Sequence, residues 1–279
     1  MTPQQLTREV ENLFTLPEIY FQVKKVINHP ASTIDDVARV VSQDPNISAQ
    51  ILKIANSAFF GFATQIDTIS RAISIMGLAH LHNLVLAVST TKSFNGINNE
   101  LINLKSFWLH SIYVAAIAQL LARQSNILDS ERLFVCGILH DIGHLVIYVT
   151  LPTHAASVLS RAKKEQIPLS TLETETFGFD YSDVGCELLK QWNLPADLYL
   201  PIQNHIHLSE EIDFLKESAI IHIAEILVLR EESDKSHIVA PALNPIALQY
   251  LDIEESQLAA IQIEARKNMA EIIKLLFSR

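Results

Sequence analysis

Apolar residues recur along this chain at intervals of three and four positions, which is the period of an α-helix and not of a β-strand. After Asp44 and Pro45, which suit a helix N-cap and first position, one helical face carries only apolar side chains: Ile47, Ile51, Ile54 and Ala55. Short apolar runs such as LVIYVTL at 145–151 fit a buried helix as well as a strand, and periodicity alone leaves them open. Since no alternating pattern stands out elsewhere, the sequence predicts an all-α fold.

Residues typical of helix starts divide this pattern into separate helices. Thr33 with Asp36, and Ser170 with Glu173, have the spacing of a capping box ahead of an apolar stripe. Ser182 is predicted to cap a helix that ends near residue 192. The longest helices are expected at about 105–123, 209–231 and 254–278.

A polar, turn-rich segment at 93–104, SFNGINNELINL, indicates a boundary between two parts of the chain. We therefore predict an N-terminal helical subdomain at 1–95, a helical bundle at 105–232 and a C-terminal helical extension at 233–279. The amphipathic helix at the end of the extension would dock either on its own domain or on a partner, and intramolecular packing is the commoner outcome.

Composition and charge narrow the class of protein. Of 279 residues, 49% are hydrophobic, which suffices for a packed core. The net charge of −10 disfavours binding to nucleic acid or to an anionic membrane, since both need clustered Lys and Arg. No secretory signal is evident, and no uninterrupted apolar run reaches the roughly 18 residues of a membrane span. With two cysteines, both in apolar helical patterns, the sequence predicts a soluble cytoplasmic protein.

Histidines and acids gather in the predicted bundle: His110, His140, Asp141, His144, His205, His222 and Glu225. Imidazoles and carboxylates from several helices can converge on a divalent metal, which would activate water and stabilise charge on a phosphoryl group. Neighbouring His140 and Asp141 would point about 100° apart on a regular helix, so both reach one ion only at a helix end or distortion, which Gly143 would permit. The same residues could equally form a hydrogen-bonded core network.

At these residues the sequence resembles a known family. The order of His110, then His140-Asp141, then an acid on a late helix is similar to the HD superfamily of metal-dependent phosphohydrolases. More specifically, about residues 12–232 resemble an HDOD domain. The motifs that carry this resemblance are Leu16-Pro17, Asp44-Pro45, ANSAFFG at 55–61, AISIMG at 72–77, FWLHS at 107–111, GILHDIGHLV at 137–146, ETFGFDYSDVG at 175–185, WNLP at 192–195 and NHIH at 204–207.

The resemblance implies a helical subdomain ahead of an HD-like bundle, in a regulatory module of bacterial signalling that has often lost hydrolase activity. It places metal ligands at His110, His140 and Asp141, with Glu225 where the late helix usually presents Asp. A single divalent ion (Mg, Mn or Fe) held weakly by these four residues, or no cofactor at all, is the expectation.

Other positions depart from the family pattern. Tyr181 stands where a histidine is usual, and Ile206 replaces the second member of a common pair after His205. His144 stands where related phosphodiesterases carry Lys. Because a phenol, with a pKa of about 10, is a poor ligand for Mg²⁺ or Mn²⁺, a second metal is not expected.

These observations favour a noncatalytic signalling module that acts by association with another protein, whose identity the sequence does not give; homodimerisation stays open. The alternative is a metal-dependent phosphohydrolase acting on a nucleotide or other phosphoester. A third hypothesis is a pocket that binds a small anion without cleaving it.

Overall fold

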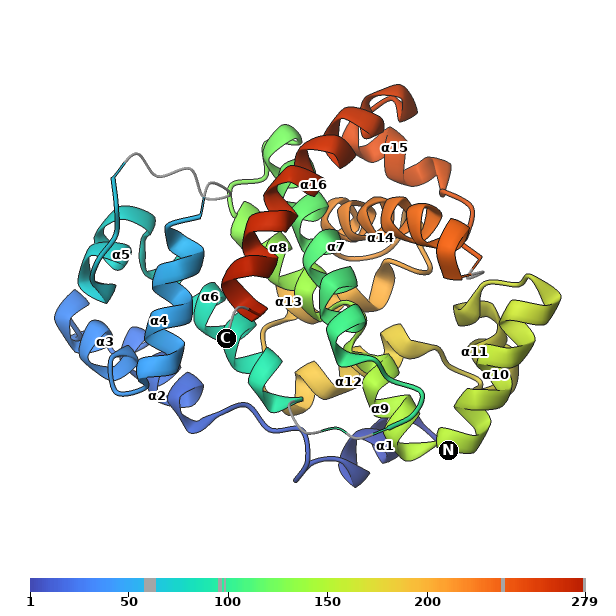
Figure 1. The fold of residues 1–279 in the computed structure, drawn as a ribbon, viewed down its shortest axis with the longest axis horizontal. Coiled ribbons are helices and arrows are strands. Elements are labelled where there is room, and N and C mark those ends of the chain that lie inside the picture. The colour runs from blue at the N-terminus through green and yellow to red at the C-terminus, as the bar shows by residue number, and fades with distance from the viewer. Residues whose placement is uncertain (58–63, 95–96, 98, 237–238, 278–279) are drawn as a thin grey trace. The chain divides into compact units, whose positions relative to one another are not determined.

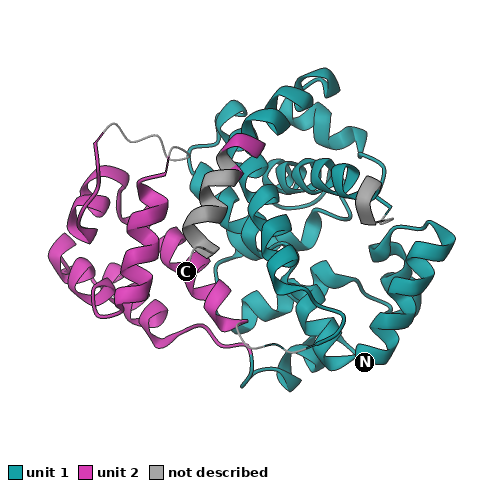
Figure 2. Cartoon of the chain, viewed as in Figure 1, with its two compact units in different colours: residues 1–13, 97–265 teal, residues 14–96, 266–279 magenta. Residues whose placement is uncertain are grey.

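The structure, a computed structural model, describes residues 1–57, 64–94, 97, 99–236 and 239–277. Every regular element within these ranges is a helix, which confirms the predicted all-α fold (Figure 1). The chain divides into two compact units (Figure 2): a large unit of residues 1–13 and 97–265, and a small unit of residues 14–96 and 266–279. The last four residues of the ANSAFFG motif, 58–61, and the aromatic residues within them lie outside the described residues.

The small unit is built from helices, two of which begin at the caps that the sequence predicts. Its helices are α2 (Glu18–Ile27), α3 (Ile34–Val41), α4 (Pro45–Ala55), α5 (Ile69–Met76) and α6 (Leu78–Ser93). The predicted capping box of Thr33 and Asp36 is present in full, and Asp44 caps α4 through the amides of residues 46 and 47. The apolar stripe after Pro45 is buried, so the periodicity identified the core face of α4 correctly.

The large unit is a helical bundle around one long apolar helix, α7 (Leu104–Gln124), against which α8 (Ser130–Leu139) and α14 (Leu215–Ser236) pack. The other helices are α1 (Pro3–Glu9), α9 (Ile142–Thr150), α10 (Pro152–Glu165), α11 (Leu169–Phe177), α12 (Tyr181–Gln191), α13 (Ala196–Asn204) and α15 (Pro245–Leu251). The last helix, α16 (Glu255–Phe277), starts in the large unit, and its residues from 266 are grouped with the small unit. The run at 145–151, which periodicity left open, is helical through Thr150, and Leu151 is the C-cap of α9.

Three predicted helix starts in the large unit are wrong. The long helix expected at 209–231 begins only at Leu215 and runs to Ser236. Ser170 and Glu173 form no capping box, because the N-cap of α11 is Pro168, two residues earlier, and Ser170 is the second residue of the helix. Ser182 is not a cap but the second residue of α12, and its amide hydrogen bonds to Asp180, the true N-cap. In these two capping cases the local spacing suggested a cap, and the actual N-cap lies two residues earlier.

Two segments of the large unit, Leu104–Gln124 and Ser130–Thr150, are long and apolar enough to cross a bilayer by length and composition. The apolar stretch of the first segment is 67% buried inside the protein, and that of the second is 78% buried. Such burial is the pattern of core helices in a soluble protein, whose apolar faces are covered by other helices.

Candidate functional site

The candidate site lies where the chain passes from α8 to α9. Helix α8 ends at Leu139, His140 is its C-cap, and Asp141 precedes the first residue of α9. The helix break expected at this pair is therefore present, and it lets neighbouring side chains turn toward one region. Gly143 serves a different purpose from the one expected: a Cβ there would lie 1.9 Å from the carbonyl oxygen of Tyr181, so glycine permits close packing of α12 on α9.

The rings of His110 and His140 face each other with their Nε2 atoms, which are 3.3 Å apart. His140 is fully buried and its Nδ1 donates to the Gly137 carbonyl oxygen at 2.7 Å. On the other side, His110 Nδ1 lies 3.0 Å from Glu232 Oε2. Because a carbonyl or an ionised carboxylate can only accept, both Nδ1 atoms carry the hydrogen, and each neutral ring then turns the lone pair of Nε2 toward the other.

Two facing lone pairs need something positive between them. A proton on His110 Nε2 satisfies the contact, and a metal cation bound by both nitrogens would satisfy it equally. Two imidazole nitrogens that share one divalent ion at about 2.0–2.1 Å lie roughly 2.9–3.4 Å apart, depending on the angle at the ion, and this range includes the observed separation. The ligand atoms of His110, His140 and Asp141 all lie within 4.8 Å of one another. The residues present therefore fit one divalent ion.

Burial and charge set the protonation of these two rings differently. Burial lowers the pKa of His140 to about 4, so this ring stays neutral near pH 7. Burial also lowers the pKa of His110, but the Glu232 hydrogen bond and nearby carboxylates outweigh it and leave that pKa raised. His110 is therefore the ring that carries the shared proton when no cation occupies the position.

Asp141 is held by His144, one helical turn later. His144 Nδ1 hydrogen bonds to Asp141 Oδ1, and His144 Nε2 lies 3.1 Å from Glu173 Oε1 in an ion pair whose hydrogen-bond geometry is poor. Although burial opposes a charge on this ring, the two carboxylates hold the pKa of His144 well above its usual range. The ring also stacks on Tyr181, with centroids 4.0 Å apart. His144 is thus a charged, tightly held partner for Asp141.

Glu225, the fourth predicted ligand, has both oxygens engaged by protein groups. The Tyr181 hydroxyl donates to Oε1 at 2.5 Å, and His205 Nε2 lies 2.7 Å from Oε2. Burial opposes ionisation of Glu225, yet the paired charge of His205 holds the pKa of this carboxyl far below its usual range. Facing Glu225 likewise raises the pKa of His205 against the effect of burial. The three side chains form a buried ionic network beside the histidine pair.

His222 does not join either group. Its Nδ1 donates to the His205 carbonyl oxygen at 2.8 Å, and its Nε2 accepts from the Asn244 amide at 3.0 Å. Burial lowers the pKa of His222 to about 4, in keeping with this neutral bridging role. His222 therefore ties α14 to the segment before α15.

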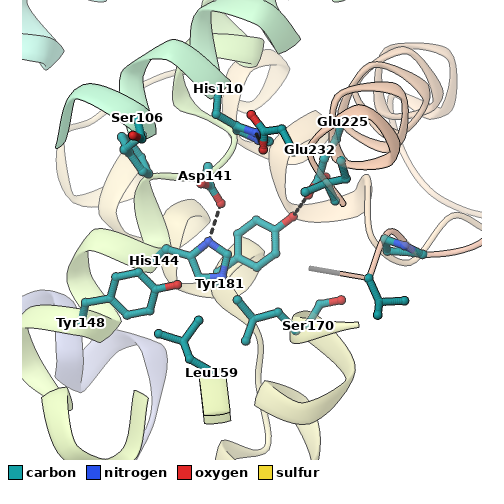
Figure 3. Close-up of a pocket in the computed structure, with 15 residues that line it drawn as sticks. Ser106, His110, Asp141, His144, Tyr148, Leu159, Ser170, Tyr181, Glu225 and Glu232 are labelled. Atoms are coloured by element: carbon teal, nitrogen blue, oxygen red, sulfur yellow. Dashed lines mark hydrogen bonds and ion pairs between the residues drawn. The ribbon is translucent and has the colours of Figure 1, made fainter. Parts of the chain in front are cut away.

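A cavity of about 370 Å³ opens onto the cluster (Figure 3). Its described lining combines the site residues with apolar side chains: Ser106, Phe107, His110, Asp141, His144, Tyr148, Leu159, Leu169, Ser170, Tyr181, Glu225, Leu229, Glu232, Val239 and Pro241. Among these described residues there is no Lys or Arg, although phosphate groups are commonly bound by such cations. The cavity can admit a small ligand, but it offers a phosphoryl group little positive charge beyond the imidazoles.

Two contributors were not anticipated from the sequence. Glu232 follows Glu225 by seven residues, so a helical wheel would have placed both acids on one face of α14. Glu173 was assigned to a helix cap, but it is buried and contacts His144 and the Tyr181 amide. No local pattern distinguishes such an acid from a capping residue.

Known proteins share this architecture. The HDOD domain family model matches residues 13–208. A solved protein from Shewanella amazonensis SB2B, provisionally named a phosphohydrolase, is 27% identical, with a TM-score of 0.75 and 97% of each chain covered. An HDOD domain protein of unknown function from Geobacter sulfurreducens is 23% identical, with a TM-score of 0.76 over 99% of this chain and 98% of that one. An uncharacterized Treponema pallidum (strain Nichols) protein is 26% identical over 200 residues, which are 71% of this chain.

The all-α fold, with His110, His140 and Asp141 brought together in the large unit, is consistent with the HD class that the sequence resembles. Because the family model covers more than half of the sequence, the chain belongs to the HDOD domain family. It spans only 38% of the length of its Treponema relative.

Proposed function

We propose that the protein is a non-hydrolytic HDOD module of bacterial signalling, which works in the cytoplasm by associating with another protein. The observation that carries this proposal is the state of Glu225, whose two oxygens are bound by Tyr181 and His205. A carboxylate so engaged is poorly placed to bind an ion or to take a proton from water. The lack of Lys or Arg in the described cavity lining supports the same conclusion.

The remaining part of the site would hold one ion, through His110, His140 and Asp141. A divalent ion bound there would polarise a phosphoryl oxygen and lower the pKa of a bound water. His144 keeps Asp141 ionised and oriented. Glu232 orients the ring of His110 through its Nδ1, which leaves Nε2 of the neutral ring free to bind an ion. In this proposal such an ion is weakly held and serves the structure of the module.

A hydrolysis assay on the full chain tests the proposal. The purified protein would be incubated with Mg²⁺, Mn²⁺ or Fe²⁺ and with p-nitrophenyl phosphate, its bis ester, nucleotides and cyclic dinucleotides. We expect rates equal to those of Asp141→Ala, which removes a candidate ligand. Metal-dependent turnover that disappears in Asp141→Ala would overturn the proposal.

A genetic experiment tests the regulatory half separately. If the module works by association, an Asp141→Ala allele should restore a deletion phenotype as well as the wild-type allele does. Complementation by the wild type alone, with equal protein levels, would instead indicate that the site itself is needed.

One observation favours a second candidate, a metal-dependent phosphohydrolase. It is the convergence of His110 and His140 on a position that fits one ion. This candidate predicts a stoichiometric ion in the purified protein and turnover of at least one phosphoester, and the same hydrolysis assay decides between the two.

A further inference from the structure

Glu232 makes a specific contact that the family resemblance does not assign. It lies near the end of α14, and Figure 3 shows it beside His110 at the edge of the cavity. Its Oε2 is 3.0 Å from His110 Nδ1, while Nε2 of the same ring faces His140. The carboxylate therefore contacts the side of the ring that points away from the candidate ion position.

We infer that Glu232 is a positioning residue that fixes the tautomer and orientation of His110 so that Nε2 is presented to a divalent cation shared with His140 and Asp141. The inference rests on the single-ion site described above, but not on whether that site hydrolyses anything. It extends the site from α7 and the α8–α9 junction to the end of α14.

The physical argument concerns which nitrogen carries the hydrogen. An unrestrained neutral histidine in water favours hydrogen on Nε2, which would remove the lone pair that an ion needs. A carboxylate at Nδ1 reverses this preference because it can only accept, and it also makes Nε2 a stronger donor of electrons to a metal. His140 is fixed in the same tautomer by the Gly137 carbonyl oxygen. Each ring thus has its own acceptor behind it.

The size of the effect follows from the exposure of the pair. Removing such an outer partner typically weakens metal binding by about 10–100-fold. The Glu232 side chain is 38% exposed, against 11% for His110, so solvent competes for the contact. We therefore expect the loss of metal affinity on removing Glu232 to lie near the lower end of this range, at about tenfold.

Glu231 provides a matched control on the same turn of α14. Its Oε2 accepts from the Tyr113 hydroxyl at 2.9 Å and from Gln262 Nε2 at 3.2 Å, so it joins α14 to α7 and α16 without touching His110. Glu231→Ala removes a carboxylate and its packing contacts from the same turn of α14 but leaves the contact between Glu232 and His110 in place. A purely structural role of Glu232 would therefore affect metal binding equally in both variants.

The experiment measures Mn²⁺ affinity of the full, metal-stripped chain by electron paramagnetic resonance of the free ion. We expect the wild type to bind one Mn²⁺ ion per chain and Glu232→Ala to bind it about tenfold more weakly. Glu232→Gln, which keeps an acceptor, should have an intermediate affinity. Glu231→Ala should change the affinity by less than about twofold. Equal affinity of Glu232→Ala and wild type overturns the inference, as does an equal loss in both alanine variants. Absence of Mn²⁺ binding by the wild type also overturns it.

A second readout is independent of any ion. In protein labelled with ¹⁵N-histidine, at a pH where the ring is neutral, His110 should carry its hydrogen on Nδ1, and Glu232→Ala should shift it toward Nε2. An unchanged tautomer in that variant would contradict the inference even if affinity fell. Neither measurement depends on turnover, so failure of this inference and failure of the proposed function give different results.

Discussion

Replacing Tyr181 by Phe tests the buried network that we hold responsible for engaging Glu225. The substitution keeps the ring that stacks on His144 and removes only the hydroxyl, which donates to Glu225 at 2.5 Å. Hydrogen bonds to charged groups contribute about 1.5–3 kcal/mol, and the loss leaves a buried carboxylate oxygen without that donor. We therefore expect Tyr181→Phe to lower the free energy of unfolding of the large unit by about 2 kcal/mol.

Tryptophan fluorescence during urea unfolding is the suitable assay, because both tryptophans of the chain, Trp108 and Trp192, lie in the large unit. The signal then reports on that unit and not on the small one. With a slope near 2 kcal/mol per molar urea, the expected loss moves the midpoint down by about 1 M.

Tyr148→Phe is the matched control for this measurement. Tyr148 stacks on His144 as Tyr181 does, but no hydrogen bond joins its hydroxyl to another residue that the structure describes. Its substitution should change stability by less than about 0.5 kcal/mol. If Tyr181→Phe is no more destabilising than Tyr148→Phe, the network does not stabilise the site and our reasoning about Glu225 is refuted.

Three further predictions follow from the site and its packing. Gly143→Ala should destabilise the large unit by more than about 3 kcal/mol in the same assay, because the added Cβ would overlap the backbone of α12. Gly178→Ala is the control: its Cβ would meet open space, and its φ of +82° should cost only about 1 kcal/mol. Burial lowers the pKa of His222 to about 4 from its ordinary 6.5. The stability that the neutral ring contributes is therefore present above pH 6.5 and falls by about 2 kcal/mol at pH 5. Urea midpoints measured above pH 6.5 and at pH 5 should show this fall, and it should be smaller in His222→Gln. Asp141→Asn should weaken Mn²⁺ binding at least tenfold, whereas Glu225→Gln should leave it within about twofold; a large loss in Glu225→Gln would make Glu225 a ligand.

Helices were predictable because the signal is local. The stripe after Asp44 is buried as its spacing predicted, since four neighbouring residues are enough to define a helical face. Helix starts were less predictable where a tertiary contact determines them. Glu173 has the right spacing from Ser170 for a cap, but burial against His144 and the Tyr181 amide uses its carboxylate instead.

The site was predictable only in part, for the same reason. His110, His140 and Asp141 were nominated by the family order, and the structure brings their ligand atoms together. The contact of Tyr181 with Glu225 joins residues 44 positions apart, and no spacing rule on one helix reports it. Glu232 lacked any motif, although its seven-residue separation from Glu225 was available as a weak signal.

Tyr181, which stands where the resemblance would place a histidine, does more than withhold one metal ligand. A phenol beside a carboxylate donates a hydrogen bond, so it holds Glu225 in place together with His205. An ion that recruited Glu225 would have to break this buried pair, and breaking such a pair costs about 3–5 kcal/mol. Since about 1.4 kcal/mol is a factor of ten, that cost weakens ion binding by at least about a hundredfold. In our proposal Tyr181 thus changes the role of Glu225 from candidate ligand to partner in a structural ion pair. Among the residues that the structure describes, His110, His140 and Asp141 are then the candidate ligands that remain at this position.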